Sequence, residues 1–410
     1  MFTPKSIFLL IAIIVLLAIA WNTDITTVYI FFVIAFVMFV LSFMHLYFNI
    51  PDIEFKRDVM DAAFEDDILN VKIALKNKRI ISSYFFEVVD NFAGAPPEEQ
   101  GKSLFILDIK AKETKKINYF VNCYKRGLWK IGPVLFVSQD ALGFFKFKKT
   151  LHVVSEILVY PSLFKVFSFP PLASGSVSWM GVETAKISGD SHEFFGIREY
   201  QRGDVMSRIH WPSTARHGRL IVKQFERNAV QEATIIFDLK KGHDIGVGRE
   251  TTLGYAVKIA GSVARYLLNE GALVQMIAYG KKYSIMLPFG KGQSHMYKIF
   301  EKLAMVQADG DMTLGQALEE ASFIAPHRST VITIMLDNDM QALSSLIQFK
   351  VKGIKLIVIV LATATFGHAD EGEYLDAEGA KEFDEGLASL EAYVYRISKG
   401  DDLEKAFETV

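Results

Sequence analysis

Two long apolar runs at the N-terminus constrain this chain more than any other feature of its sequence. Ile7 to Trp21 contains no charged or polar side chain, and Ile25 to Phe48, 24 residues, contains no Asp, Glu, Lys or Arg. A helix rises about 1.5 Å per residue, so the second run spans about 36 Å, more than a hydrocarbon core of about 30 Å. The sequence therefore predicts that residues 1–50 form a membrane anchor of two transmembrane helices.

The first run has a second interpretation. Lys5 followed by an apolar stretch that ends in Ala18-Ile19-Ala20 also fits a secretory signal peptide with a small-residue cleavage site. The second run begins after only a short Asn22-Thr23-Asp24 turn, which favours an uncleaved helical hairpin.

Flanking charges predict the orientation of the anchor. Lys5 precedes the first run, Lys56 and Arg57 follow the second, and no Lys or Arg lies between the runs. Because cytoplasmic flanks carry the excess of Lys and Arg, we expect a multi-pass protein of the cell inner (cytoplasmic) membrane whose soluble domains face the cytoplasm. A cleaved first run would leave the second as a stop-transfer segment with the same orientation.

Composition excludes several other classes of protein. The chain has 410 residues, enough for two or three domains. A net charge of −2 argues against a general nucleic-acid binder. One cysteine excludes an intramolecular disulfide framework and a cysteine-based metal cluster. We expect no cofactor and no nucleic-acid partner.

Residues 51–161 show period-two alternation and predict a β-rich domain, a small sandwich or barrel. Turn signals such as Arg126-Gly127 and Gly132-Pro133 separate the expected strands. These strands cover Val71–Lys76, Tyr84–Val89, Leu104–Ile109, Lys116–Val121 and Leu128–Val137. Residues 162–230 follow as a linker and a charged block, and the length of the linker suggests that it is ordered against a domain or partner.

Residues 231–410 alternate between apolar strands and helices. Strands such as Thr330–Asp337 and Ile354–Leu361 are almost wholly apolar, which is typical of a parallel sheet covered on both faces. The sequence predicts a doubly wound α/β domain.

The carboxyl ends of its strands are the expected place for chemistry, and Asp238, Asp337 and Asp339 lie there. The turn Gly246-Val247-Gly248 precedes a helix but lacks the spacing of a dinucleotide or P-loop motif, so a flexible loop is the simpler interpretation.

The block from Arg198 to Arg227 is locally basic, with seven Lys or Arg against three acids. One interpretation is structural, with the acids paired to nearby arginines and Ile209, Trp211 and Phe225 anchoring the block. The other is a docking patch for an anion or a protein. The candidate residues are Arg198, Glu199, Tyr200, Gly203, Asp204, Arg208, Trp211, Ala215, Arg216, Lys223 and Glu226.

This block, together with Arg126–Pro133, Asp140–Phe145 and Val159–Pro161, resembles the bacterial domain-of-unknown-function family 58. The resemblance implies two N-terminal spans, a β-domain and a von Willebrand factor A-like α/β domain. It also implies partners, namely the lipid bilayer, a MoxR-type AAA+ ATPase and a transglutaminase-like membrane protein, in the assembly or maturation of other components.

The sequence departs from the metal-binding pattern of von Willebrand factor A domains. Those that bind a divalent cation use Asp-x-Ser-x-Ser, whereas Lys240 and Gly242 stand at the serine positions after Asp238. The ammonium would repel a cation and could pair with Asp238 instead, so we expect no metal. A degenerate site at Asp238, Asp337 and Asp339 stays open.

Three functions then compete. An enzyme is disfavoured, because the sequence lacks the hydrolase elbow and zinc motifs, and because His192, His210, His217 and His243 have no evident nucleophile or orienting partner. A metal-dependent adhesion or ligand-binding module conflicts with Lys240 and with the orientation. We therefore expect a non-enzymatic, membrane-anchored interaction or assembly protein. The acidic run Asp370–Glu385 is a weaker docking candidate than the basic block.

Overall fold

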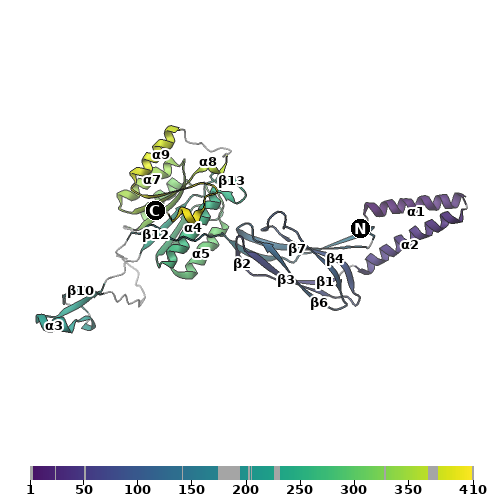
Figure 1. Ribbon diagram of the computed structural model, residues 1–410, viewed down its shortest axis with the longest axis horizontal. Coiled ribbons are helices and arrows are strands. Elements are labelled where there is room, and N and C mark those ends of the chain that lie inside the picture. The colour runs from purple at the N-terminus through teal and green to yellow at the C-terminus, as the bar shows by residue number, and fades with distance from the viewer. Residues whose placement is uncertain are drawn as a thin grey trace. The chain divides into compact units, whose positions relative to one another are not determined.

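The computed structural model describes residues 3–23, 25–49, 52–140, 142–173, 194–201, 204, 206–225, 231–326, 329–367 and 377–408. The chain divides into two compact units, one of residues 1–163 with 300–306 and one of residues 164–299 with 307–410. Figure 1 colours these parts along the chain.

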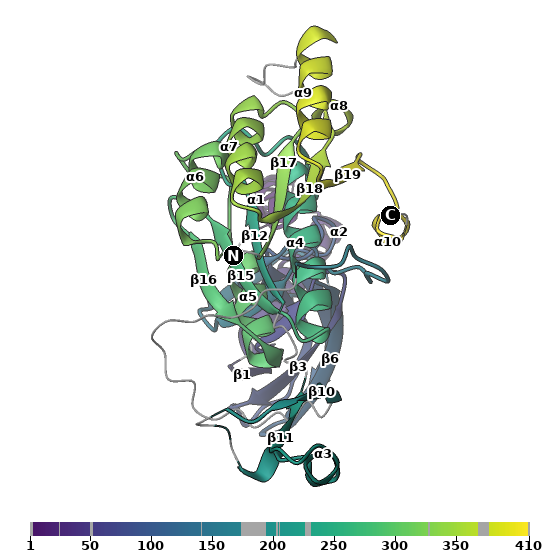
Figure 2. The ribbon, with the colours of Figure 1, turned by 90° about the vertical axis from the view of Figure 1, so that its left-hand side faces the viewer.

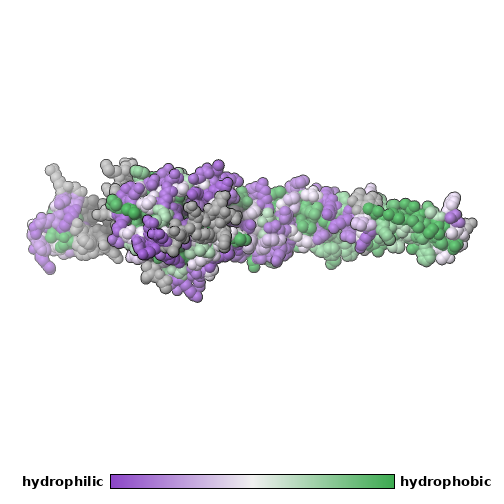
Figure 3. All heavy atoms as spheres, turned by 90° about the horizontal axis from the view of Figure 1, so that it is seen from above, coloured by the Kyte–Doolittle hydropathy of each residue, from purple (hydrophilic) through white to green (hydrophobic). Residues whose placement is uncertain are grey.

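The first unit begins with two apolar helices, α1 (Pro4–Thr23) and α2 (Thr26–Asn49), which lie side by side as a hairpin (Figure 1). Both are long and apolar enough to cross a membrane, judged by length and composition. Most of their large apolar side chains are exposed, and Figure 3 shows this as a hydrophobic surface over the helices. Two N-terminal apolar helices are therefore confirmed.

Residues 53–160 form a two-sheet β-sandwich. One sheet has the order β1-β3-β6, with β1 at Ile53–Asp58, β3 at Ile68–Asn77 and β6 at Thr114–Asn122. The other has the order β2-β9-β7-β4-β5, with β8 also paired to β7. Its strands are β2 (Ala62–Phe64), β4 (Ser83–Phe92), β5 (Lys102–Ile109), β7 (Gly127–Gln139), β8 (Lys146–Leu151) and β9 (Ser155–Tyr160). Alternate residues of both sheets, such as Val71 and Phe86, share one core.

The expected strand Leu128–Val137 is part of β7, so Gly132-Pro133 does not separate two strands. It lies inside β7, opposite a register shift between Asp90 and Phe92. Gly132 has φ 110°, and a Cβ there would lie 2.3 Å from the Val153 carbonyl oxygen. The glycine therefore serves a bulge, where β7 changes partner from β9 to β8.

The second unit contains a six-stranded sheet of order β16-β15-β12-β17-β18-β19. All neighbours are parallel except β16, which runs antiparallel to β15. The strands are β12 (Glu232–Phe237), β15 (Leu273–Ala278), β16 (Ile285–Gly290), β17 (Thr330–Leu336), β18 (Lys355–Leu361) and β19 (Tyr393–Ile397). Because the central strands are buried on both faces, the sheet has the doubly wound architecture predicted from its apolar strands.

Helices cover the sheet on both sides (Figure 2). α6 (Leu314–Ile324), α7 (Met340–Val351) and α9 (Ala377–Ser389) share one hydrophobic cluster with alternate residues of the central strands. α4 (Thr252–Asn269) contacts β12, β15 and β17 from the other face. The remaining helices are α5 (Gly292–Met305), α8 (Thr363–Phe366) and α10 (Leu403–Ala406). The acidic run is in part the exposed side of α9, which buries Phe383 and Leu387, and its residues 370–376 lie outside the described part.

The start of the predicted linker is ordered against the α/β unit. The Phe164 N–H donates to Ser262 Oγ at 3.0 Å, and the Ala173 N–H donates to Thr330 Oγ1 at 2.8 Å. Residues 164–173 are thus a strap on this unit, and residues 174–193 of the predicted linker lie outside the described part of the chain.

The basic block folds as a small hairpin unit. β10 (Phe194–Glu199) and β11 (Ile221–Phe225) pair antiparallel, and between them lie a 3₁₀ turn, η1 (Met206–Arg208), and α3 (Trp211–His217). Pro212 opens α3, and Gly218 in the left-handed region ends it.

Candidate functional site

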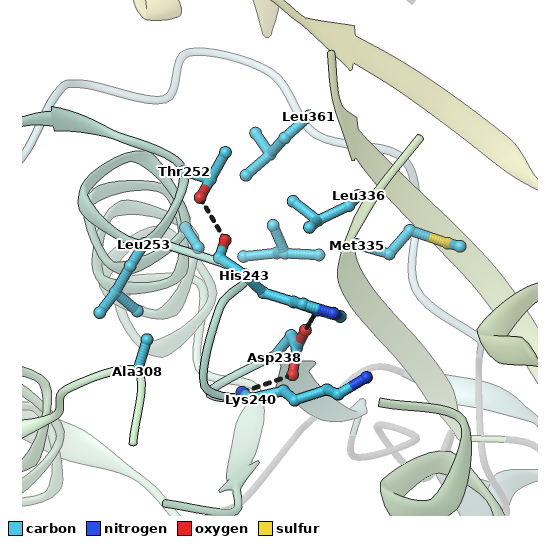
Figure 4. A pocket seen from close by; sticks show the side chains of 11 residues that line it. Asp238, Lys240, His243, Thr252, Leu253, Ala308, Met335, Leu336 and Leu361 are labelled. Atoms are coloured by element: carbon cyan, nitrogen blue, oxygen red, sulfur yellow. Dashed lines mark hydrogen bonds and ion pairs between the residues drawn. The ribbon is translucent and has the colours of Figure 1, made fainter. Parts of the chain in front are cut away.

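A small pocket, partly open to solvent, lies at the carboxyl ends of β12, β17 and β18 (Figure 4). This is the edge at which open parallel sheets place their ligand sites. Its polar lining residues are Asp238, Lys240, His243 and Thr252, and aliphatic side chains of α4 and the strands form the rest. The predicted position of the site is therefore where the structure has a pocket.

Asp238 is held on both carboxylate oxygens. Its Oδ1 accepts from the Lys240 backbone N–H at 2.8 Å, and its Oδ2 accepts from His243 Nδ1. The Asp238 side chain is 9% exposed and that of His243 28%. We expected the Lys240 ammonium to pair with Asp238, but it extends past the carboxylate, and the imidazole takes that place (Figure 4).

The sequence interpretation therefore missed the orienting partner of His243. His243 follows the strand-ending Asp238 by five residues, and the turn folds back to bring the two together. Oriented through Nδ1, the ring keeps Nε2 for a ligand. The close spacing of an acid and a histidine after a buried strand could have predicted this pair.

The other two predicted carboxylates have separate roles. Asp339 caps α7, because its Oδ1 accepts from the Ala342 N–H at 2.9 Å. Burial raises the pKa of Asp339, the hydrogen bond from Ala342 opposes this, and the Asp238 carboxylate raises the pKa further. Asp337 accepts from Thr363 Oγ1 at 2.6 Å and so fixes the start of α8.

In the part of the chain that the structure describes, no group of three or more His, Cys, Asp or Glu side chains is placed to hold a metal ion. The degenerate cation site at Asp238, Asp337 and Asp339 stays a prediction.

The glycine turn is an ordered hairpin rather than a flexible loop. β13 (Gly246–Val247) pairs with β14 (Glu250–Thr251), and Gly246 has φ 126°. Thr252 Oγ1 accepts from the Ile245 N–H at 2.9 Å and donates to the His243 carbonyl at 2.6 Å. These bonds hold the turn that carries His243.

The same turn occupies the N-terminus of α4. The Leu253 N–H donates to Asp244 Oδ1 at 3.3 Å, and the Gly254 N–H donates to Thr251 Oγ1 at 3.0 Å. A phosphate cradle needs such N–H groups unengaged. This helix start therefore does not offer the chemistry of a nucleotide site.

Within the hairpin unit, Asp204 and Glu199 pair with arginines as the structural interpretation expected. Arg198 forms a two-pronged ion pair with Asp204, with distances of 2.7 and 2.6 Å, and hydrogen bonding to Asp204 raises the pKa of Arg198. Glu199 pairs with Arg219. The Tyr200 N–H donates to the Leu220 carbonyl at 2.9 Å, which continues the hairpin.

Trp211 does not anchor the block. Its side chain is 62% exposed, and no residue of α3 is buried, whereas Ile209 is buried beneath. Ala215 and Arg216 are also exposed, and Lys223 is half-buried on β11. The candidate residues thus fall into two groups. One group is paired within the hairpin unit, and the other lies wholly or partly exposed at its surface: Trp211, Ala215, Arg216 and Lys223.

Some predicted residues are outside the described part of the chain. Gly203, Glu226 and His192 are among them, as are the side chains of Arg208 and Phe225. His210 and His217 make local contacts to Ser213.

Comparison with known proteins gives a family without a function. Residues 196–364 match the family described as "Protein of unknown function DUF58". The uncharacterized protein YeaD of Bacillus subtilis is 21% identical over 238 residues, 57% of this chain and 57% of that protein.

Solved structures give weaker similarities. The CARDB domain of a Pyrococcus furiosus protein has a TM-score of 0.20 and 14% identity over 27% of this chain and 93% of that domain. Red sea bream transglutaminase has a TM-score of 0.20 and 11% identity over 26% of this chain and 15% of that enzyme.

Proposed function

Given that the chain belongs to the DUF58 family, we propose that it is a non-enzymatic, membrane-anchored protein that captures a cytoplasmic partner through its hairpin unit. The α/β unit would be a von Willebrand factor A-like domain, and the partner a MoxR-type AAA+ ATPase acting with a transglutaminase-like membrane protein.

The anchor is proposed to be a two-span hairpin in the inner membrane with both ends in the cytoplasm. The Thr3 N–H and hydroxyl donate to carbonyls of the β7–β8 turn, with a distance of 3.2 Å from the N–H to the Phe144 carbonyl. The Arg79 guanidinium donates to the Phe48 carbonyl at 2.8 Å. Both outer ends of the helix pair therefore lie on one domain, which supports a hairpin that keeps its first helix.

The observation that carries the partner proposal is the exposure of α3. A seven-residue helix with no buried residue contributes little to its own unit, yet it presents Trp211 and Arg216. Tryptophan and arginine are enriched among the residues that dominate protein interfaces. A surface of this composition is suited to an acidic partner with an apolar pocket.

Capture of the full-length protein from detergent, with and without ATP, tests this proposal. We expect an AAA+ ATPase to co-purify and the double variant Arg208→Ala/Arg216→Ala to reduce its recovery. The matched control is Lys298→Ala/Lys302→Ala on α5, which removes the same charge from another surface. Equal recovery with all three proteins would reject the docking patch.

A metal-dependent adhesion module remains the alternative to this function. It requires a cation at Asp238, whose two oxygens are engaged by Lys240 N and His243 Nδ1. A Mg²⁺-dependent rise in the unfolding temperature that Asp238→Asn abolishes would favour it.

The Asp238–His243 pair supports a second candidate, a hydrolase. A histidine oriented by a buried carboxylate is the base of many acyl-transfer enzymes. Among the described lining residues the Thr252 hydroxyl is engaged within the turn, so a water molecule would attack the ester carbonyl carbon. Its proton would pass to His243 Nε2 and then to the departing oxygen as the ester C–O bond breaks. Turnover of p-nitrophenyl esters that is lost in His243→Gln would support this candidate, and equal background rates in both proteins would reject it.

A further inference from the structure

Three turns gather at the end of the β-sandwich that carries the helix pair. β3 ends at Asn77, β5 at Ile109 and β7 at Gln139, so residues 78–82, 110–113 and 140–145 all connect strands at this end. The register fixes this arrangement, because Asn77 pairs with Ile53, four residues after α2 ends at Asn49.

These segments are rich in cations. The cationic collar is defined by Lys5, Lys78, Arg79, Lys110, Lys112, Lys146, Lys148 and Lys149. Against these eight, the carboxylates nearest the three turns are Asp52, Glu54, Asp108, Glu113 and Asp140. Asp52 lies 3.7 Å from Lys149, and Glu54 lies 3.8 Å from Lys78. The collar therefore keeps a positive excess, although the whole chain has a net charge of −2.

Apolar side chains stand beside these cations. Ile80, in the turn after β3, is 82% exposed, and Leu142, in the turn after β7, is 49% exposed. Phe145, in the third turn, contacts Phe39 and Phe43 of α2 with ring centroids 5.2 and 5.6 Å apart. The β7–β8 turn therefore lies along the last part of α2.

The depth of this contact follows from helix length. If about 20 residues from Thr26 cross the hydrocarbon, the boundary falls near His45. At about 1.5 Å per residue, Phe43 then lies about 3 Å and Phe39 about 9 Å inside that boundary, so the Phe145 ring reaches into the hydrocarbon beside them. The collar is thereby placed at the level of the lipid headgroups.

We propose that the cationic collar binds the phosphates of anionic lipids in the leaflet from which α2 emerges. This inference rests on the membrane insertion assigned under the proposed function. Lys and Arg beside a membrane helix are attracted to an anionic leaflet, and the exposed isoleucine and leucine side chains suit the region just below the phosphates. The collar selects by charge, so its ligand is the phosphodiester of a lipid such as phosphatidylglycerol.

The test uses the full-length protein in nanodiscs made from equal parts of phosphatidylcholine and phosphatidylglycerol. After mild detergent extraction, lipids that stay with the protein are quantified by mass spectrometry. The collar variant is Lys78→Ser/Lys110→Ser/Lys148→Ser, which leaves Arg79 and its bond to Phe48 intact. The matched control is Lys102→Ser/Lys125→Ser/Lys130→Ser, at the opposite end of the same strands.

We expect the wild-type protein and the control to retain phosphatidylglycerol in preference to phosphatidylcholine. The collar variant should lose this preference by about five-fold or more, since three of eight cations are removed. In 1 M salt the preference should also fall, because the screening length shortens from about 10 Å to about 3 Å.

Several outcomes would overturn the inference. Equal retention of both lipids by the wild type, or an equal loss in the collar variant and the control, would show that the collar is not the binding site. Carbonate washing of membranes gives the separate check: extraction of the wild-type chain would reject membrane insertion itself, whereas a resistant chain without lipid preference would reject only the collar.

Discussion

Arg57 and Asp90 form an ion pair inside the β-sandwich, with Nη2 and Oδ1 2.5 Å apart and both side chains fully buried. Tyr119 Oη donates to the second oxygen of Asp90 at 2.8 Å, and burial raises the pKa of the Tyr119 phenol, which keeps it a donor. The sequence interpretation counted Arg57 among the charges that flank the second apolar run. In the folded chain this charge belongs to the core, and the surface cations near α2 come from distant turns.

Asp90→Ala should destabilise the sandwich strongly. It leaves the Arg57 guanidinium buried without its carboxylate, and loss of one partner of such a pair costs about 3–5 kcal/mol. Tyr119→Phe, which removes only one hydrogen bond to a charged group, should cost about 1.5–3 kcal/mol. Thermal unfolding of the full-length protein in detergent ranks the two, and an equal or larger effect for Tyr119→Phe would contradict this account.

Asp339→Asn should change how stability depends on pH. Because the folded pKa of Asp339 is raised above 3.8, the folded chain holds a proton that the unfolded chain releases. Stability is therefore lost as pH rises from about 3.8 through the raised value, and the neutral amide removes that loss.

The variant should match the wild type near pH 4 and unfold at a higher temperature at pH 7. Asn still caps α7, whereas the control Asp339→Ala loses the cap, at about 1 kcal/mol. A variant less stable than the wild type at pH 7 would show that the carboxylate is favourable where it lies.

Gly246→Ala should disrupt the turn that carries His243. Gly246 has φ 126°, and an added Cβ would lie 2.2 Å from the Glu250 carbonyl oxygen. Gly242→Ala is the control, because Gly242 has φ 90° but no atom within 4 Å of its Cβ position. We expect the first change to cost roughly 1–3 kcal/mol beyond the second, measured by thermal unfolding. Similar losses would mean that the turn relaxes easily.

Arg198→Ala should loosen the hairpin unit, whereas Arg216→Ala should not. Arg198 bridges β10 to Asp204, which also accepts from the Gln201 N–H at 2.8 Å. Limited proteolysis should cut the Arg198 variant faster between residues 194 and 225. Equal cleavage of the two variants would show that this ion pair is dispensable.

Periodicity predicted most strands and helices of both domains, because burial on one or two faces leaves a direct trace in the sequence. The strands expected at Thr330–Asp337 and Ile354–Leu361 match β17 and β18 to within one residue at each end. β16 was missed because Ile285–Gly290 contains a proline and is only partly buried at the sheet edge. α9 was not predicted because its sequence is mostly acidic. It buries only a few side chains, among them Phe383 and Leu387.

The site was predicted by position better than by contact. The topology rule placed Asp238 at the right edge, since it depends only on where parallel strands end. The side chain that pairs with Asp238 is His243 and not Lys240. This depends on the path of the turn after β12, which residue spacing alone does not specify. The exposure of Trp211 was not predicted for a similar reason, because a short helix with no buried residue leaves no periodicity in the sequence.

The bond from Thr3 to the β7–β8 turn has a mechanical consequence. If the soluble part of a chain contacts only one helix of its anchor, a force on the soluble part acts on that helix alone. Here the turn that receives Thr3 also carries Phe145, which lies against α2, so a load on the sandwich is divided between both helices. In the membrane anchor proposed above, a pull from the soluble side would therefore act on both helices at once.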